Sequence, residues 1–167
     1  MLIFLVGMMG SGKTTIGKLL ANEMSLPFFD TDEIISSIEE KSIAEIFNQF
    51  GEEYFRNVEK EIVNNWKIGD GVIATGGGLP CHDDLITLLN EKGKTIFLVT
   101  SSSHIIDRIK DDFSRPLVAG KPLAEVKKTV SYLLKIRKEF YLKARIKVKT
   151  DKGPEETVKR IMRKLYQ

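Results

Sequence analysis

Short apolar runs alternate with longer stretches of helical spacing along the whole chain. Five of the runs are apolar on both faces, which is typical of parallel strands covered by helices on both sides. These runs predict strands at residues 2–6, 27–30, 72–75, 95–99 and 146–149. Helical spacing is found at residues 13–24, 32–40, 43–66, 83–92, 104–110, 123–142 and 154–166. The alternation predicts a three-layer α/β/α domain with a five-stranded parallel sheet and right-handed crossovers.

Two of the predicted helices carry signals at their beginnings. We expect Asp32 to be the N-cap of the helix at 32–40, because a carboxylate there accepts from exposed backbone N–H groups. Pro154 suits the first turn of the last helix, and Glu155 and Glu156 place negative charge near the positive end of its dipole. Ligands of such sheets bind beyond the carboxyl ends of the strands, so functional residues are expected in the segments that follow them.

The segment after the first strand matches a phosphate-binding loop. Residues 7–14 read GMMGSGKT, which fits the pattern GxxxxGK[ST] between a strand and a helix. Glycines let backbone N–H groups turn inward around an anion, and the following helix points its positive end at the same anion. The Lys13 ammonium suits the terminal phosphates, and the Thr14 hydroxyl suits magnesium. A P-loop domain is therefore predicted, and a glycine-rich turn without a ligand is the alternative. The predicted nucleotide contacts in the loop are Gly10, Ser11, Gly12, Lys13, Thr14 and Thr15.

Length and composition narrow the class of protein further. A chain of 167 residues fits one domain, 1–167. Its net charge of +3 is mild and favours small anionic ligands over nucleic acid. With one cysteine, Cys81, no internal disulfide can form, and we interpret this thiol as structural. No apolar run approaches the roughly 18 residues that span a bilayer. We expect a cytoplasmic protein without a nucleic-acid or membrane partner.

The remaining motifs point to a small-molecule kinase. The Asn-Lys-x-Asp string of GTP-binding switch proteins and the Leu-Ser-Gly-Gly string of transport ATPases do not occur. Catalysis of phosphoryl transfer consists mostly of positioning and charge neutralisation, so arginines aimed at phosphates and an acid near the acceptor hydroxyl are expected. Residues of both kinds follow the predicted strands.

Seven strings in a fixed order resemble the shikimate kinase family over nearly the whole chain. They are GMMGSGKTTIG, DTD, SIAEIF, GEEYFRNVE, ATGGG, RPL and R-x-x-x-Y. The resemblance implies transfer of the γ-phosphoryl group of ATP to the 3-hydroxyl of shikimate, with Mg²⁺ as cofactor. It also implies a place on the route to chorismate and the aromatic amino acids. The partners expected are shikimate and ATP, and the expected state is a monomer.

The resemblance also implies roles for single residues on the acceptor side. Asp32 would orient or deprotonate the acceptor hydroxyl, and Asp30 would be associated with magnesium, through water. Arg56 and Arg137 would grip the carboxylate of the substrate, because a planar guanidinium meets a carboxylate with two parallel bonds. Surface ion pairs with nearby glutamates are the alternative for these arginines. Glu59, one turn after Arg56, is expected to fix the Arg56 side chain.

Further roles fall on the glycine run and on the second half of the chain. Gly76, Gly77 and Gly78 would bring backbone amides close to the substrate ring, and the Thr75 hydroxyl before them could join the water shell of magnesium. Arg115 would act as a catalytic residue with Lys13 and Asp32, from a lid over residues 112–121. Arg108 would stack on adenine. A substrate-binding helical segment is predicted at residues 32–61.

Two segments depart from the family pattern, and two other functions stay open. Lys149 stands where an acidic residue is expected in the loop on the adenine side, and residues 120–127 match no family string. A gluconate or nucleoside monophosphate kinase on the same scaffold is the first alternative. A nucleotide-binding module that has lost catalysis is the second. The retention of Asp32, Arg56, Arg115 and Arg137 argues against the second.

Overall fold

A parallel sheet forms the centre of the protein, whose computed structural model describes residues 1–67, 69–112 and 117–167. Within these residues five strands pair in the order β2-β3-β1-β4-β5, and every pairing is parallel. The strands are β1 (Leu2–Val6), β2 (Phe28–Asp30), β3 (Gly71–Ala74), β4 (Lys94–Val99) and β5 (Ile146–Lys149). The predicted five-stranded sheet is confirmed, with each predicted end within one residue of the observed end.

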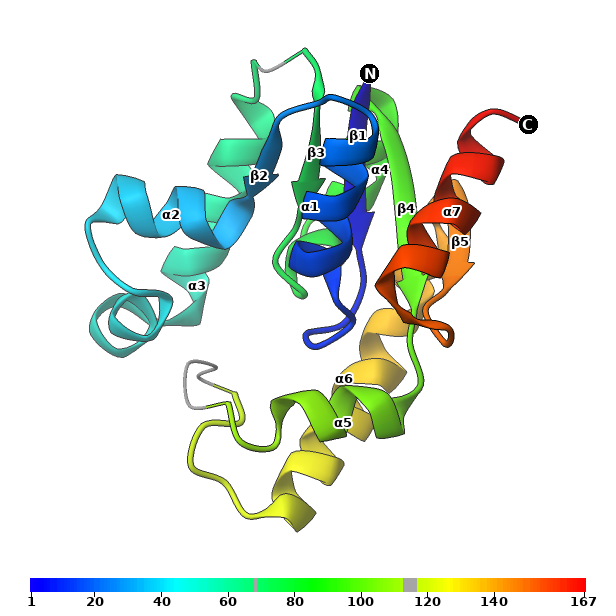
Figure 1. Ribbon diagram of the computed structural model, residues 1–167. Helices are drawn as coiled ribbons and strands as arrows, with labels where there is room; N and C mark the ends of the chain where they lie inside the picture. The colour runs from blue at the N-terminus through cyan, green and yellow to red at the C-terminus, as the bar shows by residue number, and fades with distance from the viewer. Residues whose placement is uncertain (68, 113–116) are drawn as a thin grey trace.

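Helices cover both faces of this sheet. They are α1 (Lys13–Glu23), α2 (Thr31–Glu39), α3 (Ile43–Asn64), α4 (Leu85–Lys92), α5 (Ser102–Ile109), α6 (Leu123–Leu142) and α7 (Gly153–Leu165), with a 3-10 turn η1 (Leu79–Cys81). Figure 1 shows α1 and α7 in front of the strands, with the α2–α3 pair beyond β2 and the α5–α6 pair below the carboxyl ends of the strands. The predicted three-layer α/β/α arrangement is confirmed.

The burial of β1 explains why the sheet lies between two helical layers. All five residues of the strand are buried. Ile3 and Leu5 pack in one cluster with residues of α1 and α7, whereas Phe4 and Val6 pack in another with residues of α4 and α6. Successive side chains of a strand point to opposite faces, so a strand that is apolar throughout needs cover on both sides. In the described residues no helix is both long and apolar enough to cross a membrane.

Two predictions about helices need correction. Asp32 is not the N-cap of α2. Asp30 has this position, with an extended backbone and a carboxylate that accepts from the Asp32 backbone N at 3.0 Å. The α3 helix is not continuous, because Gly51 inside it has φ +83° and bends the chain. Its beginning is set by a capping box between Ser42 and Glu45, and the bend redirects the half that carries Arg56.

Candidate active site

The phosphate loop leaves β1 and enters α1 in the strand–loop–helix context that the sequence predicts. Lys13 is buried, and its Nζ donates to the carbonyl oxygens of Gly7 and Met8 at 2.8 and 3.0 Å. Gly10 and Gly12 have φ of +74° and +91°, a conformation that favours glycine. The loop is thus wrapped around the lysine, which holds a positive charge at the start of a helix.

A cavity of about 270 Å³ opens over this loop. It is lined by most of the predicted nucleotide contacts, namely Gly10, Gly12, Lys13, Thr14, Thr15 and Arg108. Ser11 is fully buried below the surface of the loop. The Arg108 Nη1 donates to the Gly10 carbonyl at 2.9 Å, so α5 is tied to the loop. The structure therefore brings the predicted nucleotide residues of α1 and α5 to one place.

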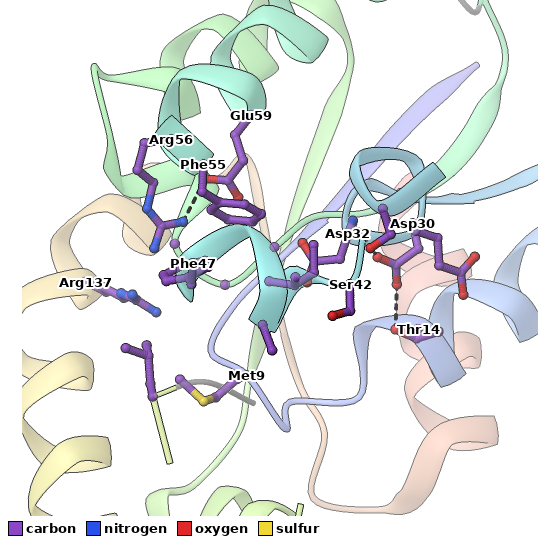
Figure 2. A pocket seen from close by; sticks show the side chains of 18 residues that line it. Met9, Thr14, Asp30, Asp32, Ser42, Phe47, Phe55, Arg56, Glu59 and Arg137 are labelled. Atoms are coloured by element: carbon purple, nitrogen blue, oxygen red, sulfur yellow. Dashed lines mark hydrogen bonds and ion pairs between the residues drawn. The ribbon is translucent and has the colours of Figure 1, made fainter. Parts of the chain in front are cut away.

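Asp30 joins the end of β2 to the phosphate loop. One carboxylate oxygen accepts from the Thr14 hydroxyl at 2.8 Å, and the other caps α2. Both residues line the small cavity, and Figure 2 shows their contact at one side of the larger pocket. This contact places two hard oxygen donors beside the predicted phosphate position.

A larger cavity of about 560 Å³ lies next to the first. All six predicted acceptor-side residues line it, namely Asp32, Arg56, Gly76, Gly77, Gly78 and Arg137. They come from α2, α3, α6 and the turn after β3, and are therefore brought together by the tertiary fold rather than by sequence proximity. In Figure 2 Arg137 enters from the side opposite to Asp30 and Thr14.

Two carboxylates hold the guanidinium of Arg56. Its Nη1 donates to Glu59 at 2.7 Å, and its Nη2 donates to Glu52 at 2.8 Å. The expected Arg56–Glu59 pair is thus present, and Glu59 is fully buried. Burial disfavours the charge on Arg56, but the two carboxylates outweigh it and raise the pKa of the guanidinium. Arg56 is a fixed cation at the cavity wall.

The side chains of Arg56 and Glu59 fill the space beside the glycine turn, so a Cβ at Gly76 or Gly78 would have to displace them. A Cβ on Gly78 would lie 2.5 Å from the Arg56 Nη1, and one on Gly76 would lie 2.7 Å from the Glu59 Oε1. A Cβ on Gly77 would lie 3.6 Å from the Arg137 Nη1. Both guanidinium groups therefore lie close to adjacent residues of one turn, which is the convergence that a two-arginine carboxylate site needs.

The cations around the turn affect two neighbouring groups. The pKa of His82 is lowered by burial and then by Arg56, because a second positive charge there is unfavourable. Burial raises the pKa of the Cys81 thiol to about 11, so it stays protonated at neutral pH. This agrees with the interpretation of Cys81 as structural.

Sequence reasoning missed the apolar wall of the cavity. Apolar side chains that line it are Met9, Ile43, Phe47, Phe55 and Leu117. The string SIAEIF contains two of them, and Phe55 directly precedes Arg56, so the signal was present without an assigned role. A ring-shaped ligand with polar edges could lie against this wall while its charged group faces the arginines.

Two further residues with predicted roles, Arg115 and Thr75, differ in what the structure shows of them. Arg115 lies outside the described residues, which end at 112 and resume at 117. The Thr75 hydroxyl donates to the Leu5 carbonyl at 3.1 Å, and Thr75 lines the small cavity.

The loop after β5, which departs from the family pattern at Lys149, is held by α7. Arg160 of this helix donates to the Lys149 carbonyl at 3.0 Å and to the Asp151 carboxylate at 2.5 Å. Arg160 thus holds this loop through one backbone carbonyl and one carboxylate, although Lys149 replaces the expected acid.

The pH dependence of stability should reveal the burial of Glu59. Burial raises the pKa of this carboxyl to about 7 from 4.5, against the opposing effect of Arg56. The folded state then binds a proton that the unfolded chain releases, so the contribution of Glu59 is most favourable below pH 4.5 and is lost as the pH rises through about 7. Glu59→Gln mimics the protonated acid. Its deficit in unfolding free energy against the wild type should shrink by roughly 2 kcal/mol between pH 5 and pH 8 in urea unfolding.

Glu53→Gln is the matched control for this measurement, because Glu53 is exposed on the same helix. Its difference from the wild type should stay constant over the same pH range. A Glu59→Gln deficit that stays constant between pH 5 and pH 8 would show that Glu59 is ionised in the fold throughout this range.

Comparisons with known proteins show which family the chain resembles over nearly its full length. The family model described as shikimate kinase matches residues 9–166. A shikimate kinase of Aquifex aeolicus is 40% identical over 163 residues, which cover 97% of this chain and 94% of the relative. One from a Sulfurihydrogenibium species is 37% identical and covers 98% and 96%. The solved structure of shikimate kinase from Acinetobacter baumannii in complex with shikimate is 30% identical, has a TM-score of 0.92, and covers 99% of this chain and 92% of that one.

Proposed function

Because the chain belongs to the shikimate kinase family, we propose that its larger cavity binds shikimate and presents the 3-hydroxyl to ATP at the phosphate loop. The enzyme catalyses the ATP-dependent phosphorylation of shikimate in aromatic amino acid biosynthesis. Family membership also decides against the gluconate, nucleotide and non-catalytic alternatives.

One observation carries the proposal, namely the shared wall of the two cavities. Met9, Thr14, Asp30, Asp32, Gly76 and Gly77 line both of them. A phosphoryl group bound above Lys13 and a hydroxyl in the larger cavity would therefore meet beside Asp32. Phosphoryl transfer requires the attacking oxygen in line with the leaving group, and two adjoining sites provide that placement.

Each side chain then has a defined task. Arg56 and Arg137 bind the substrate carboxylate and thereby fix the orientation of the ring. Asp32 accepts the proton of the 3-hydroxyl or orients this group, and needs little basicity because the transition state is loose. Lys13 stabilises the charge on the transferring group. Phe47 and Phe55 exclude water from the apolar face of the ring.

Magnesium is the proposed cofactor, and the residues present fit it. The Thr14 hydroxyl and the Asp30 carboxylate are hard oxygen donors in contact with each other beside the phosphate position. Among the described residues no cluster of three or more His, Cys, Asp or Glu side chains could hold a metal ion. The protein would therefore supply Thr14 directly and Asp30 through water. When bound, the ion neutralises charge on the β- and γ-phosphates.

The position of the new phosphate tests the acceptor assignment. The purified protein is incubated with ATP, Mg²⁺ and shikimate, and the product is analysed by phosphorus–proton NMR correlation. We expect the phosphate on the oxygen of C3. Phosphate on another ring oxygen would refute the proposed placement of the substrate, and gluconate and nucleoside monophosphates should give no product above background.

Arg160 offers a test of the nucleotide side. Thr150 and Pro154 line a small cavity next to Gly12 and Arg108, and Arg160 holds the loop that carries them. Arg160→Gln should raise the KM for ATP about threefold and leave the KM for shikimate unchanged. Arg163→Gln, at an exposed position of the same helix, is the control. A change in the KM for shikimate alone would contradict this assignment.

Several expectations remain predictions. The catalytic role of Arg115, the lid at 112–121 and the substrate-binding segment at 32–61 belong to the proposal, as does the stacking of Arg108 on adenine. So do the monomeric state and the cytoplasmic location.

A further inference from the structure

Tyr141 completes the R-x-x-x-Y string, and the proposed function assigns it no role. It follows Arg137 by one turn of α6, so both side chains lie on the same face of the helix. It is fully buried. Its hydroxyl donates to the carbonyl oxygen of Gly77 at 2.6 Å, across 64 positions of the sequence. A buried tyrosine hydroxyl usually finds a partner, so the identity of this partner is what matters.

Gly77 lies between the two halves of the candidate active site. A Cβ on this residue would lie 3.1 Å from the backbone N of Met9 in the phosphate loop and 3.6 Å from the Arg137 Nη1. Gly77 also lines both cavities. A small rotation of its peptide groups would therefore alter the approach of the substrate to the phosphate loop.

The hydrogen bonds of the turn show what Tyr141 fixes. The N–H of Gly76 donates to the Thr31 hydroxyl at 2.8 Å, which anchors the start of the turn. The carbonyl oxygens of Gly76 and Gly78 accept from Leu79 and Cys81 within η1. The Gly77 carbonyl between them is held from outside, by α6.

This bond sets the direction of the next N–H group. Peptide groups are planar and trans, so the N–H of Gly78 points opposite to the carbonyl of Gly77. With the carbonyl bonded to the Tyr141 hydroxyl, this N–H points away from that hydroxyl, and Gly78 itself lines the larger cavity. Anchoring one atom thus orients a donor for the substrate.

The tyrosine itself is rigid and keeps its proton. Its ring stacks on Phe97 of β4 with centroids 5.2 Å apart and an interplanar angle of 29°. Burial raises the pKa of the Tyr141 hydroxyl, so it keeps its proton and remains a donor at neutral pH. The anchor therefore connects the glycine turn to the central sheet.

We propose that Tyr141 is a positioning residue for the phosphoryl acceptor, whose hydroxyl holds the Gly77–Gly78 peptide so that the Gly78 N–H faces the bound substrate. The inference rests on the proposed function, because it takes the larger cavity as the shikimate site. Tyr141 acts through the turn and contacts neither shikimate nor ATP.

Tyr141→Phe removes the hydroxyl and keeps the ring, and it tests this role. The KM for shikimate should rise about tenfold, whereas the KM for ATP should change less than twofold. Tyr132→Phe is the matched control, since Tyr132 lies on the same helix with its side chain 62% exposed. This control should leave both constants unchanged.

Two results would overturn the role. A lower thermal midpoint with an unchanged KM for shikimate would show that Tyr141 only stabilises the core and does not position the acceptor. An equal rise of both KM values would mean that the whole site is disturbed. Kinetics are measured at 15 °C, so that a moderate loss of stability leaves the variant folded.

A second variant keeps the inference testable if Tyr141→Phe does not fold. Phe97→Leu loosens the ring of Tyr141 and retains its hydroxyl, and it should raise the KM for shikimate about threefold. An unchanged KM in that variant would overturn the role. The wild type is assayed alongside, because a wild type that does not phosphorylate shikimate would refute the proposed function itself rather than the role of Tyr141.

Discussion

Lys13→Ala is expected to lower the turnover number of the kinase by about a thousandfold. The ammonium of Lys13 lies in the phosphate loop, held by two carbonyl oxygens, at the wall of the small cavity. There it would stabilise the charge that develops on the transferring group, an effect that is large in a site from which water is excluded. Release of ADP in a coupled assay with saturating ATP and shikimate measures the loss.

Lys18→Ala is the control for this prediction. Lys18 lies five positions further along the same helix and is exposed. Its replacement removes one positive charge without touching the phosphate site, so the turnover number should stay within twofold of the wild type. Equal losses in the two variants would attribute the effect to net charge, and normal turnover in Lys13→Ala would contradict the phosphate role.

Arg137→Ala is expected to raise the KM for shikimate about a hundredfold, with the KM for ATP within threefold of the wild type. Its guanidinium lies near Gly77 at the wall of the larger cavity, and Arg137 is 6% exposed. The variant lacks one of the two guanidinium groups that would bind the substrate carboxylate. The charge-assisted hydrogen bonds of that group are lost, and such bonds are strong in a buried site. Initial rates over a matrix of both substrates separate the two constants.

Lys138→Ala, at the next and exposed position of α6, is the matched control and should leave both constants unchanged. Thermal unfolding of Arg137→Ala shows whether the variant is folded at the assay temperature. A comparable loss of ATP affinity would place Arg137 on the nucleotide side.

The sheet and the phosphate loop could be predicted from the sequence because their signals are local. Leu2–Val6 is apolar at every position, and the glycines and Lys13 that follow it occupy fixed places in one short pattern. The strand and helix on either side of the loop are then required by its function as an anion site. The observed strand ends lie within one residue of the predicted ones, and the phosphate loop lies between β1 and α1 as predicted.

Features that depend on tertiary contacts could be predicted less well. Asp32 was expected to be the N-cap of α2, whereas the fold gives this position to Asp30, because Asp30 is extended at the end of β2. The bend at Gly51 needs a positive φ that the helical spacing around it conceals. The bond from Tyr141 to Gly77 joins residues 64 positions apart, which no local pattern can reveal.

The acceptor site could be predicted from the sequence only in part. Its arginines and glycines were assigned through the resemblance of strings such as GEEYFRNVE and ATGGG, whereas spacing alone allows surface ion pairs for Arg56. The structure shows both together, since Arg56 pairs with Glu52 and Glu59 and also faces the cavity. A guanidinium with several donors can be held on one side and bind a ligand on the other.

A crystal structure of this protein with shikimate and ADP tests the central claim most directly, because that claim concerns the position of one carboxylate and one hydroxyl. We predict the carboxylate within hydrogen-bond distance of both Arg56 and Arg137, and the 3-hydroxyl beside Asp32, facing the phosphate loop. A carboxylate bound at Lys13, or a ring with its 3-hydroxyl turned away from Asp32, would contradict the account.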